Sequence, residues 1–175
     1  MSVPEVLATA DRTVLQRVVD ELVIRITAMV DENGDKLWNS VGRGALPSPN
    51  ALALPAIGIV QGPEQTIHDL WPHTEKIVSI FLEFKFGRVL NVDSDDIFKY
   101  YLGKLQARLF GAKDNLTLGG LLAANVTETG SNPEIEDKND PVPGGLLMLQ
   151  VHYRHWTADP YHLVSEAPNY AYGSL

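Results

Sequence analysis

The stretch from Thr74 to Phe86 constrains the fold more than any other part of the chain, because it is the longest run of strand-forming residues. Successive side chains of a strand point to opposite faces of a sheet. One face of this strand is apolar and is expected to lie in a core; its residues are Val78, Ile80, Leu82, Phe84 and Phe86. The other face has the polar residues Glu75, Ser79, Glu83 and Lys85.

Two apolar residues, Ile77 and Phe81, interrupt that polar face. The solvated face of an antiparallel sheet has no need of them. Two interpretations stay open. Either these residues contact another subunit, or they are isolated apolar groups on the surface.

The length and composition favour one soluble domain. The chain has 175 residues, 45% of them apolar, which is enough for a sizeable core. No apolar run reaches the roughly 18 residues of a membrane span, and the first residues lack the basic-then-apolar pattern of an export signal. We therefore expect folding in a cytoplasm and no membrane partner. The absence of cysteine excludes disulfides, thiolate metal sites and cysteine nucleophiles.

The net charge of -8 argues against a protein that grips nucleic acid, since such proteins cluster a surplus of lysine and arginine. An acidic protein can still work beside DNA if its task is to let the polymer pass without binding it.

Two long helices are expected. Apolar residues recur at steps of one, three and four from Asp11 to Val30, which predicts an amphipathic helix. A second helix is predicted from Asp95 to Phe110, capped by Asp93 and ended by Gly111. Both are expected to cover the same side of the sheet. Residues 2–5 have capping-box spacing and predict a further short helix.

The turn after the first long helix resembles the start of an EF-hand loop, with Asp31, Asn33 and Asp35 at its first, third and fifth positions. The sixth position, which requires glycine, is Lys36, and the twelfth, which requires glutamate, is Gly42. Calcium binding is therefore disfavoured, and a simple turn is expected.

Shorter strands are expected on the N-terminal side of the Thr74–Phe86 strand. They are Leu37–Gly44 and Ala56–Gln61, the second being its antiparallel neighbour. Gly62-Pro63 is expected to break that strand, and Glu64–His73 to form a loop.

In the C-terminal half, a strand at Ala123–Thr129 is followed by a long acidic hairpin loop at Gly130–Gly145 and a second long strand at Leu146–Trp156. Asp159-Pro160-Tyr161 is expected to close this strand. Its apolar face comprises Leu147, Leu149, Val151 and Tyr153, and its amphipathic face comprises Met148, Gln150, His152 and Arg154.

These elements predict an α+β fold, with a mostly antiparallel sheet of four to five strands and two main helices packed on one of its faces. A long hairpin loop and an extended C-terminal arm complete it. Residues 1–161 are expected to form a single domain, and residues 162–175 a flexible arm.

Motifs of catalysis are missing from the sequence. It has no Gly-Xaa-Ser-Xaa-Gly elbow, no Walker loop, no dinucleotide fingerprint and no His-Glu-Xaa-Xaa-His. His152 and His155 lie three apart in a predicted strand, so they face opposite sides and cannot share a metal without a bulge. We expect no catalytic residue, cofactor or metal site. An alternative hypothesis, from a different class of function, is that the protein is a small metal-dependent hydrolase that uses His68, His73 or His162.

The order of elements resembles the tail terminator, or tail completion, proteins of long-tailed bacteriophages. The resemblance covers Asp11 to Tyr161 and is a pattern of architecture more than a sharp motif. Its most specific piece is the closing strand with Tyr153-Arg154, followed by Asp159-Pro160-Tyr161. The acidic loop and the C-terminal arm depart from the pattern, since members of the family are typically shorter.

The resemblance implies a virion protein, assembled in the host cytoplasm, whose subunits form a ring, expected to be a hexamer. That ring would end growth of the tail tube, contact the tube protein and the head connector, and let DNA pass without specific binding. Contacts with other subunits or the tube are then expected at Ile77, Phe81, Met148, His152, Arg154, Trp156 and Tyr161. An acidic lining of the bore is expected from Glu134, Glu136, Asp137 and Asp140. The closest alternative is another neck or head-completion subunit.

Overall fold

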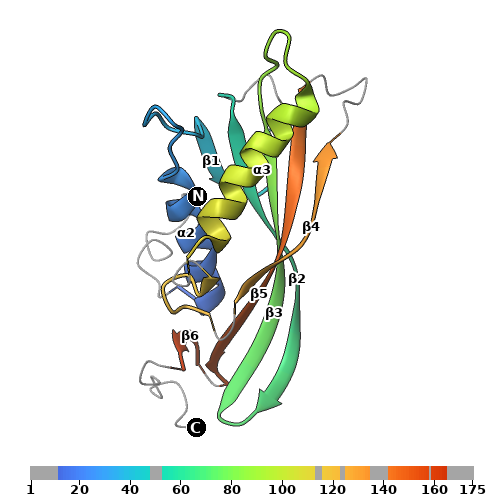
Figure 1. Ribbon diagram of the computed structural model, residues 1–175. Coiled ribbons are helices and arrows are strands. Elements are labelled where there is room, and N and C mark those ends of the chain that lie inside the picture. Colours follow the sequence, from blue (N-terminus) through green and yellow to red (C-terminus); the bar gives the residue numbers. More distant parts are fainter. Residues whose placement is uncertain are drawn as a thin grey trace, which may run out of the picture.

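The computed structural model describes residues 12–47, 53–112, 116–122, 125–134, 142–157 and 159–164. It is an α+β fold in two layers, a long twisted sheet and a layer of two helices (Figure 1). The elements are α2 (Val14–Thr27), β1 (Ser40–Arg43), β2 (Ala56–Leu70), β3 (His73–Lys85), α3 (Ser94–Phe110), β4 (Val126–Glu134), β5 (Gly144–Trp156) and β6 (Asp159–Leu163).

The sheet has six strands in the order β1-β2-β3-β5-β4, with β6 paired to β5. The expected sheet of four to five strands was too small, because the Asp159-Pro160-Tyr161 segment folds back and pairs with the end of β5. The sheet is also mixed, since β1 and β2 are parallel. The connection at residues 44–55 is long enough to return the chain to the same end of the sheet, as parallel pairing requires.

The predicted break at Gly62-Pro63 is wrong, because β2 continues through it to Leu70 and pairs with β3 along the whole length. A register shift between Gln61 and Glu64 absorbs these two residues as a bulge. Proline has no N–H to donate, so it is tolerated at a bulge where the ladder is already interrupted. The predicted loop at Glu64–His73 is therefore mostly a β-hairpin, and the predicted antiparallel pairing with β3 is confirmed.

A similar correction applies to β4, which begins later than the predicted strand and continues into the predicted acidic loop. Its register with β5 shifts between Glu128 and Gly130, and Pro133 lies near its end. Gly130 and Pro133, which usually interrupt strands, are tolerated here because β4 is the outermost strand. Of the predicted loop, residues 135–141 lie outside the described part of the chain.

The first long helix is shorter than the predicted range of 11–30. Thr13 caps it, and its hydroxyl accepts a hydrogen bond from Gln16 N at 3.2 Å while the Gln16 side chain accepts one from Thr13 N at 2.9 Å. At the other end, Asp31 closes the expected turn, since its Oδ1 accepts hydrogen bonds from the N–H groups of Asn33 and Asp35.

The second helix matches its prediction closely, with Asp93 as N-cap and Gly111 as C-cap. Both helices cover one side of the sheet, as expected (Figure 1). The Phe98 ring stacks on Phe84 of β3 at a centroid distance of 5.7 Å. Gly145 of β5 leaves the space for this stack, because a Cβ atom there would overlap the Phe98 ring. Within the described residues, no helix is long and apolar enough to cross a bilayer.

The predicted core faces of both long strands are confirmed. The buried residues are Val78, Ile80, Leu82, Phe84, Phe86, Leu147, Leu149, Val151 and Tyr153. Lys85 was assigned to the polar face but is only 5% exposed; it is the last residue of β3 and is paired with Gly144. The start of the short helix predicted from the capping-box spacing of residues 2–5, and most of the C-terminal arm, residues 165–175, lie outside the described residues.

Candidate interaction face

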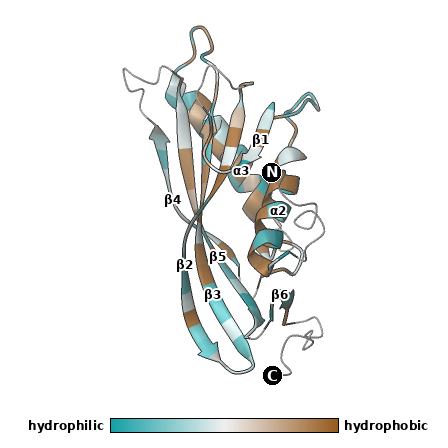
Figure 2. Ribbon diagram, turned by 180° about the vertical axis from the view of Figure 1, so that it is seen from behind, coloured by the Kyte–Doolittle hydropathy of each residue, from teal (hydrophilic) through white to brown (hydrophobic). Residues whose placement is uncertain are grey.

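The sheet has one side that α2 and α3 leave uncovered, here called the helix-free face. Figure 2 views the molecule from this side and shows hydrophobic residues in the upper half of the sheet and hydrophilic residues toward the β2–β3 hairpin. The alternation of β3 and β5 puts one set of half-buried side chains on it: Glu75, Ile77, Ser79, Phe81, Glu83, Leu146, Met148, Gln150, His152 and Arg154.

Most of the predicted contact residues come together on this face. Three directly opposed pairs join β3 to β5, and they are Phe81 with Met148, Ile77 with His152, and Glu75 with Arg154. Only Glu75 was not among the predicted contacts. Alternation along two separate strands therefore located a shared surface, although its role as an interface stays a prediction.

The other two predicted contacts, Trp156 and Tyr161, lie at the far end of β5 and on β6. Trp156 Nε1 donates a hydrogen bond to the Leu163 carbonyl at 3.1 Å, and its ring lies 4.5 Å from that of His73. Trp156 thus holds β6 against the end of β5. Tyr161 is exposed on β6, which pairs with β5 at His155 and Trp156. Phe81, by contrast, is paired with Met148, toward the other end of β5.

An apolar groove lies in the upper part of the helix-free face, with a volume of about 400 Å³. Its lining residues are Ala45, Val60, Phe81, Glu83, Asn132, Gly145 and Leu146. Two glycines shape the surface around it. The Phe81 ring covers Gly62 of β2, and Met148 covers Gly130 of β4, where an added Cβ would come within 2.9 Å of Met148 Cε. No sequence signal pointed to this groove, because both glycines were predicted to lie outside strands, Gly62 at a break and Gly130 at the start of a loop.

One wall of the groove is acidic. Glu83 Oε2 accepts a hydrogen bond from Leu46 N at 3.2 Å, which ties the segment after β1 to β3. Gly58 makes room for that segment, since a Cβ atom there would lie 2.6 Å from the Gly44 carbonyl oxygen. The groove therefore combines an apolar floor with a fixed carboxylate on its rim.

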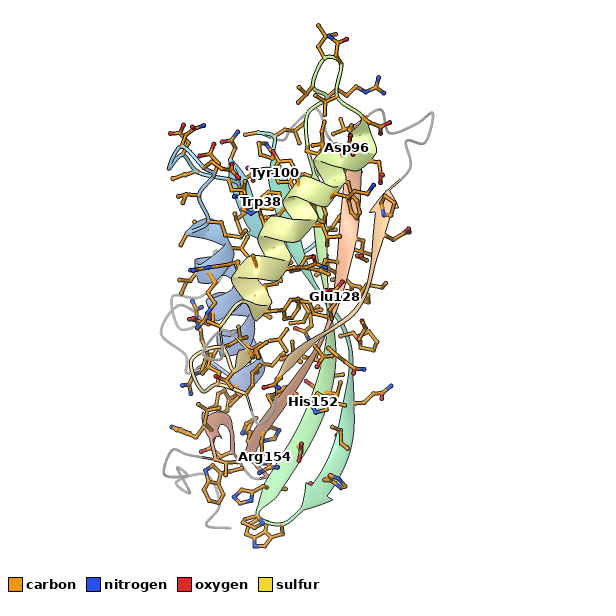
Figure 3. The ribbon with its side chains drawn as sticks, in the orientation of Figure 1. Trp38, Asp96, Tyr100, Glu128, His152 and Arg154 are labelled. Atoms are coloured by element: carbon orange, nitrogen blue, oxygen red, sulfur yellow. The ribbon has the colours of Figure 1, made fainter. Side chains whose placement is uncertain are left out.

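The lower part of the helix-free face is polar. Arg154 Nη2 donates to Glu75 Oε2 at 2.8 Å, and this hydrogen bond lowers the pKa of Glu75 below its usual value. Figure 3 shows Arg154 and His152 along this half of β5. The pair is half-exposed, so it fixes side-chain positions more than it contributes to stability.

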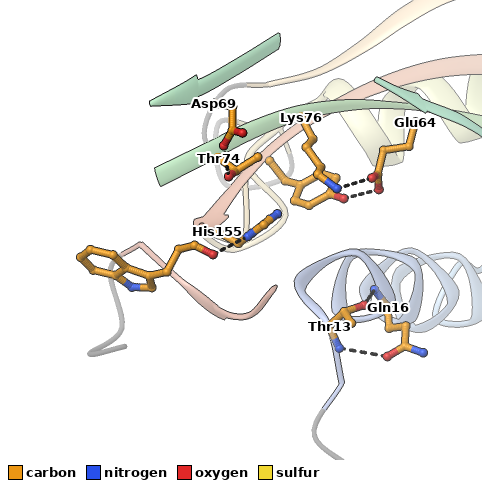
Figure 4. A network of polar contacts seen from close by, with 9 residues as sticks. Thr13, Gln16, Glu64, Asp69, Thr74, Lys76 and His155 are labelled. Carbon is orange, nitrogen blue, oxygen red and sulfur yellow. Dashed lines mark hydrogen bonds and ion pairs between the residues drawn. The ribbon is translucent and has the colours of Figure 1, made fainter. Parts of the chain in front are cut away.

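A second polar cluster lies on the opposite, helix-bearing side of the hairpin (Figure 4). Glu64 accepts a hydrogen bond from Lys76 Nζ at 2.5 Å and another from the Tyr153 hydroxyl. Burial raises the pKa of Glu64, but the hydrogen bonds from Lys76 and Tyr153 outweigh burial and lower it. Burial and the Glu64 carboxylate together raise the pKa of Tyr153 above its usual range.

A cavity of about 260 Å³ adjoins this cluster and reaches the start of α2, with Thr13 and Leu15 in its wall. The two carboxylate oxygens of Glu64 each accept a hydrogen bond, one from Lys76 of β3 and one from Tyr153 of β5. This arrangement cross-links β2, β3 and β5, and it explains the cluster as part of the packing between the hairpin and α2.

The histidines of the hydrolase hypothesis are dispersed. His68 lies on β2 opposite Glu75, His73 is at the start of β3, and His162 is on β6, where its Nδ1 lies 2.7 Å from Asp159 Oδ2. Among the residues that the structure describes, no three or more histidine, aspartate or glutamate side chains are grouped closely enough to hold a metal ion.

The proposed acidic lining falls almost entirely outside the described residues. Glu134 is the last residue of β4, and Glu136, Asp137 and Asp140 belong to the part of the chain that is not described. Their orientation toward a bore therefore stays a prediction.

Two edges of the sheet lack a strand partner among the described residues. Strand β1 pairs with β2 only as far as Arg43 and Ile59, so the rest of the outer edge of β2 has no strand partner among the described elements. Strand β4 forms the opposite edge. Unpaired edges accept strands from neighbouring chains.

Comparison with known proteins adds no family to this description. A scan against protein-family models finds no match, and a search of curated proteins finds no similar sequence. The fold and the helix-free face therefore define the chain only as an α+β protein with an open sheet face, and its function is proposed from that geometry and from the order of its elements.

Proposed function

We propose that this chain is a structural subunit that assembles with copies of itself into a ring at the head-proximal end of a phage tail, where it stops growth of the tail tube. The observation that supports this most is the helix-free face, with its row of half-buried apolar side chains and its apolar groove. Apolar surface of this kind marks a site of association.

The open edges support a ring over a closed dimer. They belong to different strands, β2 and β4, so pairing of the β2 edge of one copy with the β4 edge of the next would join two different surfaces. Such heterologous contacts propagate from one copy to the next and close into a ring when the rotation between copies allows it. The step from self-association to a phage tail depends on the resemblance in the order of elements.

The acidic character of the chain suits passage of DNA. A net charge of -8 repels phosphate, so a ring of such subunits would let DNA slide through its bore. In this proposal the partners are copies of the chain, the tube protein and the head connector. The role requires no bound cofactor and places the protein in the virion, after assembly in the host cytoplasm.

The test is native mass spectrometry and light scattering of the purified chain, alone and mixed with tail tube protein. We expect rings bound at one end of the tubes. A double variant, Phe81→Asp with Met148→Glu, should abolish binding, whereas Ile24→Asp on the exposed surface of α2 should leave it intact. A chain that stays monomeric and unbound in the presence of tubes would refute the proposal.

Electron microscopy of particles assembled without this chain separates the terminator from its nearest alternative. Overlong tubes would support the terminator. Tails of normal length that are not attached to heads would instead identify a neck or head-completion subunit, with the same assembly physics and different neighbours.

A further inference from the structure

The turn between β3 and α3 presents an exposed apolar surface, here called the knob, at Val89, Leu90 and Val92. Their side chains are exposed by 54%, 88% and 46%, respectively. Three apolar residues this exposed and this close together are unusual for a turn, where polar residues and glycine are the rule. The knob is therefore a candidate for contact with another molecule.

The backbone of the turn holds the knob in a defined shape. Val92 N donates a hydrogen bond to the Val89 carbonyl at 3.2 Å, and Asn91 takes a left-handed conformation with φ of 64°. Asparagine tolerates that conformation better than most residues do. Leu90 is thus held at the tip of a closed turn, which lowers the entropy that is lost when it docks.

The knob does not dock within its own molecule. The turn projects beyond the end of the sheet (Figure 1), and the high exposure of Leu90 means that no other part of the described chain covers it. The apolar groove, by contrast, is on the helix-free face, with Val60, Phe81 and Leu146 in its lining. The molecule therefore has an apolar projection and an apolar depression on two different surfaces.

Charge and size are complementary as well. Arg88 precedes the knob directly, and the Glu83 carboxylate lies on the rim of the groove. A groove of about 400 Å³ has room for more than one side chain of the knob. Opposite charges beside matching apolar surfaces set the orientation of a contact more than its strength.

We propose that the knob of one copy, led by Leu90, docks in the groove of the next copy, with Arg88 of the first facing Glu83 of the second. This inference rests on the proposed self-assembly and names the contact that produces it. Because knob and groove are different surfaces, the contact is heterologous and passes from each copy to the next in one direction.

The chain has no cysteine, so a disulfide cross-link tests the contact directly. Two variants, Leu90→Cys and Val60→Cys, are purified separately, mixed with tail tube protein and oxidised. Heterodimers are then measured on non-reducing gels and their bridge is confirmed by mass spectrometry. We expect the mixture to give several-fold more heterodimer than a mixture of Leu90→Cys with Ile24→Cys, in which the second cysteine is more accessible than one at the half-buried Val60 but lies on α2.

A second variant tests the energetic role of the knob. Leu90→Asp changes a side chain that is 88% exposed, so the monomer should fold normally. Loss of one docked leucine should weaken association roughly tenfold or more. Ile24→Asp is the matched control, and the dissociation constant is measured by light scattering over a dilution series.

The outcomes separate this inference from the proposed function. Rings that form normally with Leu90→Asp, or equal cross-linking in both mixtures, would overturn the knob contact and leave the ring intact. A wild-type chain that does not assemble on tubes at all would overturn both.

Discussion

The phenyl ring of Phe81 lies over Gly62 of the neighbouring strand, in the place that a side chain at that position would occupy. The glycine that looked like a strand breaker in the sequence thus serves as a seat for an aromatic ring within a continuous strand. Because Phe81 also lines the apolar groove, this one contact links the bulge in β2 to the shape of the candidate interaction face.

We expect Gly62→Ala to displace the Phe81 ring and to lower the free energy of unfolding by about 1–2 kcal/mol, since the added methyl group overpacks the site. In a Phe81→Ala background the same substitution should cost almost nothing, and a double-mutant cycle from urea denaturation measures the coupling. Gly42→Ala, where an added Cβ meets nothing within 4 Å, is the control. Additive effects of Gly62→Ala and Phe81→Ala would contradict the contact.

Gly103→Ala in the middle of α3 should stabilise the protein. An added Cβ at Gly103 meets nothing within 4 Å, and glycine in a helix interior costs about 0.5–1 kcal/mol relative to alanine. The midpoint of urea denaturation should rise accordingly with no change in its slope. Gly111→Ala is the contrasting variant, because a Cβ at this C-cap would collide with the Ala107 carbonyl, and it should destabilise. A loss of stability in Gly103→Ala would show that α3 has a neighbour at this point.

Protonation of Glu64 in acid should lower the free energy of unfolding. Its pKa is lowered in the folded state, so its contribution is complete above the unfolded value of about 4.5 and is lost as the pH falls through the folded value. Glu64→Gln should therefore flatten the dependence of unfolding free energy on pH below about pH 5.

Lys76→Met should flatten the same pH range, because it removes a hydrogen bond that lowers the pKa of Glu64. The effects of the two substitutions should not add, since both act on one pair. Urea denaturation at a series of pH values measures this. An unchanged slope in Glu64→Gln would place the acid sensitivity elsewhere.

A charge on the open edge of β2 should block strand addition. Ile67 lies at the second register shift of β2, between Thr66 and His68, and is exposed. Ile67→Lys should reduce ring formation on tubes, because a charged side chain disfavours edge pairing, while the monomer changes by less than about 0.5 kcal/mol. Ile24→Lys on α2 is the control. Undiminished rings would show that copies do not pair through this edge.

The parts of the fold that depend on local chemistry followed from the sequence. The limits of α3 were predictable because Asp93 and Gly111 act within one turn of the helix. The shared face of Phe81 and Met148 was predictable as well, since alternation along each strand assigns its faces without knowledge of the partner. Antiparallel pairing of β3 with β5 is then enough to bring these two faces together on one side of the sheet.

The parts that depend on a distant partner did not follow. Whether Gly62-Pro63 ends a strand or bulges within it is decided by the register with β3, which no local pattern encodes. The parallel pairing of β1 with β2 could not be predicted either, because a strand of four residues, Ser40–Arg43, can pair in either the parallel or the antiparallel direction. The groove combines residues from β2, β3, β4 and β5, so it exists only after the sheet is assembled.

The central pairing of the sheet also affects how the chain folds during synthesis. Strand β3 meets β2 through a local hairpin, but its other neighbour, β5, follows only after α3 and β4 have been made. Contacts between residues so distant in sequence form slowly. The edge of β3 that faces β5 stays unpaired until Trp156 has left the ribosome. The nascent chain is therefore most vulnerable to aggregation between completion of the hairpin and arrival of β5, and slower translation of this interval would prolong the exposure.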